Sequence, residues 1–228
     1  MLIEIGQKAK ETSYVLGKMG TNLKNAGLLA AAQEILDEEN EILKANAADV
    51  ARAKERGMAP GLVDRLELNH KRIEGIVEGM RQVVGLEDPV GEVISMKRRP
   101  NGLLIGQKRV PFGVIGIIYE ARPNVTADAF ALCFKTGNAV ILRGGSDALE
   151  SNKAIVTAIR NGLKKEGIPE DAISLIEDTS HETAREFMRM NGYLDVLIPR
   201  GGAGLIRTVV ENSTVPVIET GTGNCHIY

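Results

Sequence analysis

Apolar residues recur at helical spacing through the first 90 residues of the chain. One stripe runs through residues 28–43, and a second consists of Ile73, Ile76, Val77, Met80 and Val84. Spacing of three and four residues predicts amphipathic helices, because it gathers the apolar side chains on one face. Asn69 precedes the second stripe and Gly85 follows it, as helix-start and helix-stop residues do. We therefore expect an N-terminal helical region, residues 1–90, that packs on the rest of the protein.

Residues 91–111 have a different pattern. Two β-prone runs flank Pro100-Asn101-Gly102, and an Asn-Gly pair favours a tight turn. The sequence predicts a β-hairpin whose strand edges are exposed, and such edges can pair with another chain. We interpret it as an oligomerisation element of a homo-oligomer. A surface hairpin that touches no other subunit is an almost equally good interpretation.

From residue 112 onward, short apolar runs alternate with helical segments. The runs are "GVIGIIYE", "NAVILR", "ISLIE", "DVLIPR" and "VPVIET". Asn124, Ser146 and Thr179 are residue types that begin helices, and each follows one of these runs. Strands that are apolar on both faces and joined by helices are typical of a parallel sheet. The expected fold class is α/β, a Rossmann-like five-stranded parallel sheet with helices on both faces. Residues 112–228 would then form a dinucleotide-binding domain.

Two glycine-rich segments follow these runs, each beginning with an arginine. Their residues are Arg143, Gly144, Gly145 and Ser146, and Arg200, Gly201, Gly202 and Gly204. Where such a turn opens a helix, backbone N–H groups can approach a phosphate at the positive end of the helix dipole. The alternative is that the glycines only make tight turns between strand and helix.

Arg143 bears on the choice of cofactor. In dinucleotide-binding folds, an acid at the end of the second strand binds a ribose hydroxyl, and an arginine there accommodates a 2'-phosphate. Arg143 has no acid beside it before Asp147. This favours NADP(H) over NAD(H); the alternative is a solvated arginine at the start of a loop.

Composition and charge exclude several classes of protein. The chain has 228 residues, of which 43% are hydrophobic, so a sizeable core is expected. Lys and Arg number 28 against 30 Asp and Glu, a balance that gives no reason to expect nucleic acid or a membrane as partner. The two cysteines have no zinc-site spacing, so no metal is expected. We find no secretory signal and no membrane span, and expect a cytoplasmic protein.

The segments "VPFGVIGIIYEARPNVTADAFALCFKTGNAVILRGGSDALESN", "DVLIPRGGAGLI" and "VPVIETGTGNCHIY" closely resemble the gamma-glutamyl phosphate reductase family of the aldehyde dehydrogenase superfamily. The resemblance implies reduction of L-glutamyl 5-phosphate by NADPH to L-glutamate 5-semialdehyde, with release of phosphate, in proline biosynthesis. A cysteine nucleophile is implied, as is a glutamate 5-kinase partner that provides the labile acyl phosphate.

The resemblance also implies roles for individual residues. Arg143 to Ser146 would lie at the adenosine end of the cofactor, and Arg200 to Gly204 at its pyrophosphate. Glu219, followed by Gly221, would lie near the nicotinamide and the nucleophile. Arg122 and Asn124 would face the substrate.

The catalytic cysteine is expected beyond residue 228, in a second domain. The chain would then be the N-terminal, cofactor-binding half, inactive alone. Cys225 is the fallback nucleophile, whereas Cys133 lies among apolar residues of a predicted helix and is expected in the core. Two other interpretations stay open: a non-catalytic nucleotide-binding or oligomerisation module, and another acyl-reducing member of the superfamily, which "YEARPNVTADA" argues against.

Overall fold

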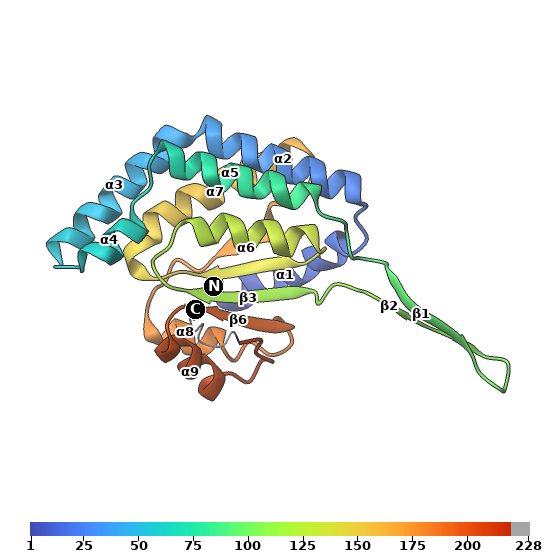
Figure 1. Cartoon of the computed structure of the whole chain (residues 1–228). Helices are drawn as coiled ribbons and strands as arrows, with labels where there is room; N and C mark the ends of the chain where they lie inside the picture. The colour runs from blue at the N-terminus through green and yellow to red at the C-terminus, as the bar shows by residue number, and fades with distance from the viewer. Residues whose placement is uncertain (220–228) are drawn as a thin grey trace, which may run out of the picture.

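A computed structural model describes residues 1–219 of the chain (Figure 1). The N-terminal region is helical, as expected, with helices α1 (Leu2–Leu16), α2 (Thr21–Asp37), α3 (Glu39–Glu55), α4 (Pro60–Leu66) and α5 (His70–Gly85). The side chain of Asn69 begins α5 by accepting a hydrogen bond from the N–H of Arg72 (2.9 Å). This satisfies one of the backbone donors that the first turn of a helix leaves without an intrahelical partner.

The predicted hairpin consists of β1 (Val93–Arg98) and β2 (Leu104–Lys108), paired antiparallel. Gly102 in its turn has a φ of +87°, a conformation that glycine adopts without strain. The hairpin projects far from the rest of the protein (Figure 1).

A parallel sheet follows, as the alternation of apolar runs predicted. Its strands are β3 (Val114–Tyr119), β4 (Ala139–Arg143), β5 (Ile173–Leu175) and β6 (Val196–Arg200), in the order β5-β4-β3-β6. All six residues of β3 are buried, which explains the unbroken apolar run. The intervening segments are α6 (Asn124–Lys135), η1 (Ser146–Ala148), α7 (Leu149–Lys165), η2 (Glu170–Ala172), α8 (His181–Phe187) and α9 (Ala203–Asn212).

The fifth expected strand is only marginal within residues 1–219. Val217 forms one parallel bridge with Leu197, held by hydrogen bonds from the N–H of Leu197 to Pro216 (2.8 Å) and from Ile218 to Leu197 (3.0 Å). The segment therefore lies beside β6, where a fifth strand belongs, but the sheet has four strands in the described part of the chain.

Helices cover the sheet on both faces. On one face α6 and α7 pack directly on the strands, and α2, α3 and α5 form an outer layer over them (Figure 1). On the other face lie α8 and α9, together with α1, whose Gly6 touches Tyr193. Apolar side chains of the N-terminal helices and of the sheet join in one continuous core, so residues 1–90 are part of the packing of the sheet region.

Three helix starts differ from the sequence expectation by one or two residues. Asn124 is the first residue of α6, and Ser180 caps α8 in place of Thr179. Ser146 makes no capping hydrogen bond and lies in the short 3-10 turn before α7. The first turn of α7 is capped instead by Asp49 of α3, whose carboxylate accepts from the N–H (2.8 Å) and hydroxyl (2.6 Å) of Ser151.

A close helix crossing holds the outer layer to α7. A Cβ at Gly162 would lie 2.5 Å from the Cα of Ala31 in α2, so the two backbones touch. Since the neighbouring atoms belong to a backbone, a side chain at residue 162 would force the helices apart.

We therefore expect Gly162→Ala to lower the free energy of unfolding by about 1–3 kcal/mol. Gly75→Ala in α5 is the matched control, since nothing lies within 4 Å of its added Cβ. That variant should gain up to about 1 kcal/mol from helix propensity. Denaturant unfolding measures both, and similar values for the two variants would contradict the close packing.

Candidate functional site

The carboxyl ends of three strands meet at one edge of the sheet. In the parallel register, Ile118 lies opposite Arg143 of β4, and Tyr119 lies opposite Arg200 of β6. The chain runs from β3 outward to β4 and β5, then returns to the other side of β3 as β6. Strand order therefore reverses at the end of β3, and ligands of open α/β sheets bind in the crevice at such a point.

Two adjoining pockets open at this edge. The first, about 360 Å³, lies over β4 and is lined by Met58, Leu62, Arg65, Glu120, Ala121, Arg122, Arg143, Gly145, Ser146, Asp147, Thr179 and His181. The second, about 350 Å³, lies between β3 and β6 and is lined by Arg65, Glu120, Arg122, Val125, Arg200, Gly201 and Gly202. Because Arg65, Glu120 and Arg122 line both, Arg143 and Arg200 lie along one shared cleft.

Arg143 is half-buried and held by the backbone. Its Nη2 donates to the carbonyl oxygens of Thr179 (2.6 Å) and Ser180 (3.2 Å), which fixes the guanidinium across the first pocket. Its Nε is buried without a hydrogen-bond partner in the described structure. Burial lowers the pKa of Arg143, and the neighbouring carboxylate of Asp178 opposes this shift. A half-buried cation that lines an open pocket is suited to an anionic ligand.

The two glycine-rich loops need glycine for close packing. A Cβ at Gly144 would lie 2.4 Å from the side-chain nitrogen of Asn152, and one at Gly145 would lie 3.3 Å from the backbone nitrogen of Ala121. A Cβ at Gly201 would lie 2.7 Å from Leu205. None of these three glycines has a positive φ. Among residues 1–219, no atom lies within 4 Å of a Cβ added at Gly204, so these residues give no packing reason for a glycine there.

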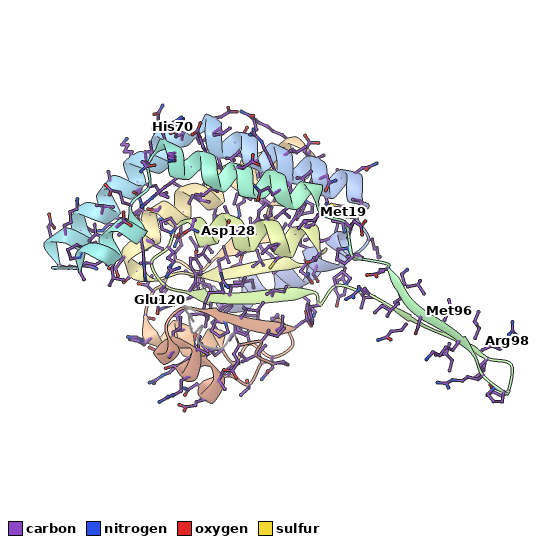
Figure 2. The ribbon with its side chains drawn as sticks, viewed as in Figure 1. Met19, His70, Met96, Arg98, Glu120 and Asp128 are labelled. Carbon is purple, nitrogen blue, oxygen red and sulfur yellow. The ribbon has the colours of Figure 1, made fainter. Side chains whose placement is uncertain are left out.

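A side chain to which the sequence analysis assigned no role, that of Glu120 directly after β3, contacts the second glycine-rich loop. The carboxylate of Glu120 accepts a hydrogen bond from the N–H of Gly202 (2.8 Å), the residue that precedes α9. Figure 2 shows Glu120 at the end of β3, between the upper helices and α8–α9. A negative charge is therefore already present where the sequence predicts a phosphate. Its position after a strand was the only signal that could have indicated it.

Of the other predicted site residues, Arg122 and Asn124 line pockets at the strand ends, whereas Glu219 is not among the lining residues of these pockets. Arg122 lines both pockets and, with Asn124, a third one beside α5 and α6. The amide of Asn124 donates to Asp128 (3.3 Å). Glu219 is exposed, whereas Gly221 and Cys225 lie outside the described residues.

The sequence of the chain is similar to those of known enzymes. The chain is 59% identical over 227 residues to a gamma-glutamyl phosphate reductase of Clostridium perfringens, covering 100% of this chain and 55% of the relative. It is 61% identical to the one of Heliobacterium modesticaldum, covering 98% and 54%. The chain is homologous to gamma-glutamyl phosphate reductases along its whole length. It spans about half the length of the curated relatives that it matches. A search against models of known protein families gave no match.

Solved structures support the same relationship. The crystal structure of gamma-glutamyl phosphate reductase from Thermotoga maritima matches 99% of this chain and 54% of its own, with a TM-score of 0.96 and 51% identity. A probable aldehyde dehydrogenase from Listeria monocytogenes matches with a TM-score of 0.71 and 16% identity, over 96% of this chain and 45% of its own. The resemblance to the reductases and the α/β fold class are thus confirmed.

Three further observations concern the described residues of this reductase homologue. Among residues 1–219, no group of His, Cys, Asp and Glu side chains could hold a metal ion. Within the same residues, no helix is both long and apolar enough to cross a bilayer. Cys133 is buried in α6, and burial raises the pKa of its thiol to about 12.

Proposed function

We propose that this chain forms the cofactor-binding part of an NADPH-dependent reductase that converts L-glutamyl 5-phosphate to L-glutamate 5-semialdehyde in proline biosynthesis. The observation that carries the proposal is the shared cleft at the end of β3, with Arg143 on one side and Arg200 on the other. The relatives are named gamma-glutamyl phosphate reductases, which supports the proposed reaction. This chain covers only about half of their length, which supports assigning to it the binding of the cofactor and not the whole reaction.

The cleft fits a phosphorylated dinucleotide. The first pocket has an apolar wall, with Met58 and Leu62, and its lining includes the cation Arg143, so it suits an adenine and a 2'-phosphate. The second pocket carries Arg200 and the N–H groups before α9, which suit a pyrophosphate. NADPH, when bound, would provide the hydride for the reduction.

The remaining roles concern the substrate. In our proposal, Arg122 and Asn124 orient the acyl phosphate, since a guanidinium binds a phosphoryl group by paired hydrogen bonds. Glu219 and Gly221 would lie towards the nicotinamide. We place the nucleophile outside the 228 residues, with Cys225 as the alternative, and expect a glutamate 5-kinase as the source of the unstable acyl phosphate.

The hairpin supports a second role, in oligomerisation. Ile94, Met96 and Leu104 are 49%, 56% and 59% exposed on β1 and β2, and Figure 2 shows Met96 far from the body of the protein. At its base, Asp88 bonds to Lys24 (2.6 Å) and to the hydroxyl of Thr21 (2.9 Å), which anchors the hairpin on α2. An anchored, apolar strand pair with free edges is suited to a second copy of the chain.

The cofactor preference can be tested by calorimetric titration. We expect NADPH to bind more tightly than NADH, and Arg143→Ala to weaken NADPH binding about tenfold, because a charge-assisted contact to the 2'-phosphate is lost. Binding of NADH should change little. Arg81→Ala, an exposed arginine of α5 outside the cleft, is the control. Equal affinities for the two nucleotides in the unaltered chain would overturn the assignment of Arg143.

The burial of Cys133 predicts that the Cys225→Ser variant is inert towards thiol reagents. Cys133 is then the remaining thiol, and with a pKa of about 12 its thiolate fraction at pH 8 is on the order of 10⁻⁴. Denaturant should release one reactive thiol, which serves as the control. We also expect no turnover of L-glutamyl 5-phosphate by residues 1–228. Turnover that Cys225→Ser abolishes would move the nucleophile into this chain.

For the hairpin, we expect Leu104→Arg to weaken self-association in sedimentation velocity, because it places a charge in an apolar contact. Unfolding should be unchanged, since Leu104 is outside the core. A sedimentation coefficient equal to that of the unaltered chain at every concentration would contradict an oligomeric role.

A further inference from the structure

Three arginines from separate parts of the chain line the second pocket. Arg65 comes from α4, Arg122 from the loop between β3 and α6, and Arg200 from the end of β6. The one acid in that lining is Glu120, which is bound to the N–H of Gly202. The pocket therefore has an excess of positive charge, and it is open to a ligand.

Arg65 differs from Arg52, Arg56 and Arg72, the arginines near it in the sequence. Arg56 pairs with Asp147 (3.4 Å), Arg72 pairs with Asp64 (2.8 Å), and Arg52 pairs with Asp49. Within residues 1–219, Arg65 forms no ion pair or side-chain hydrogen bond, although Asp64 is its neighbour in sequence. It is also a lining residue of three adjoining pockets at the strand ends.

The position of Arg65 is fixed by buried polar contacts. The amide of Asn46 in α3 donates to the carbonyl of Leu66 (2.8 Å) and accepts from the N–H of Leu68 (2.7 Å). Asn46 also donates to the hydroxyl of Ser151 at the start of α7 (3.1 Å). Leu66 itself is fully buried in a small apolar cluster with Val63. The backbone at Arg65 is thus held against α3, so only the side chain of Arg65 has to be ordered when a ligand binds.

We propose that Arg65 is a ligand-binding residue, which completes with Arg122 and Arg200 a site for a phosphoryl group. This rests on the proposed function, because two phosphoryl sources would reach this cleft: the pyrophosphate of the nucleotide and the acyl phosphate of the substrate. Guanidinium groups bind phosphoryl oxygens in pairs of parallel hydrogen bonds, and three of them match a dianion better than a carboxylate. The N-terminal helices then contribute a binding group in addition to packing.

The test measures the affinity of Arg65→Ala, Arg65→Lys and the unaltered chain for three probes: NADPH, acetyl phosphate and inorganic phosphate. We expect Arg65→Ala to weaken the binding of inorganic phosphate and of at least one other probe five- to tenfold. If NADPH is the other probe that is weakened, the site belongs to the pyrophosphate; if acetyl phosphate is, the site belongs to the acyl phosphate. Arg65→Lys should recover only part of the affinity, because an ammonium lacks the paired donors.

Arg207→Ala, an exposed arginine of α9 outside the pocket lining, is the matched control and should bind all probes like the unaltered chain. Unfolding of Arg65→Ala should also be unchanged, since the Arg65 side chain makes no hydrogen bond or ion pair within residues 1–219 that would be lost. Unchanged affinity for every probe would overturn the proposal. If the unaltered chain binds phosphate but not NADPH, the proposed cofactor is wrong, and the Arg65 site then stands or falls on the phosphate measurement alone.

Discussion

The parallel pairing of β3 with both of its neighbours is the constraint on which the site depends. Because β3 is buried along its whole length and bonded on both sides, its end is fixed between the ends of β4 and β6. Arg143 and Arg200 are 57 residues apart in the sequence, and this register places them on either side of one strand end. A one-residue slip of register would send their side chains to the other face of the sheet.

A second constraint fixes the wall of the cleft that faces the strands. Asp49 caps α7 through Ser151, and Asn46 binds the backbone on both sides of Glu67. Both side chains are buried, so each would be costly to leave without its partners. They are therefore satisfied only when α3, α4 and α7 have their observed arrangement. The same contacts that stabilise the helices position Met58, Leu62 and Arg65 over the strand ends.

Positive charge exceeds negative charge among the residues that line the second pocket. Glu120 provides one carboxylate at the start of α9, and the arginines around it have no other acid among the lining residues of the second pocket. An anionic ligand would therefore meet guanidinium groups and backbone N–H donors together, and would compete with Glu120 for Gly202. The proposed sites for the dinucleotide, for the acyl phosphate and at Arg65 therefore share the same positively charged cleft.

The sequence by itself determined the kind of elements and the motif residues at the strand ends. The apolar run through β3 and the turn at Gly102 are local signals, and each produced the expected strand or hairpin. Helix starts were less certain: Ser146 looked like the cap of α7, but Asp49, 102 residues away from Ser151, caps it. A distant side chain can replace a local one wherever packing brings it within hydrogen-bond distance.

Only the tertiary structure revealed Glu120 and Arg65 as members of the cleft. Each is an ordinary charged residue in the sequence, and its significance comes from what the fold places opposite it. The extent of the fifth strand also depended on the tertiary structure. The segment "VPVIET" is apolar like the other runs, but within residues 1–219 it forms a single bridge. Periodicity reports which face of an element is buried, while the meeting of charges from separate elements depends on the three-dimensional register of the sheet and the helices around it.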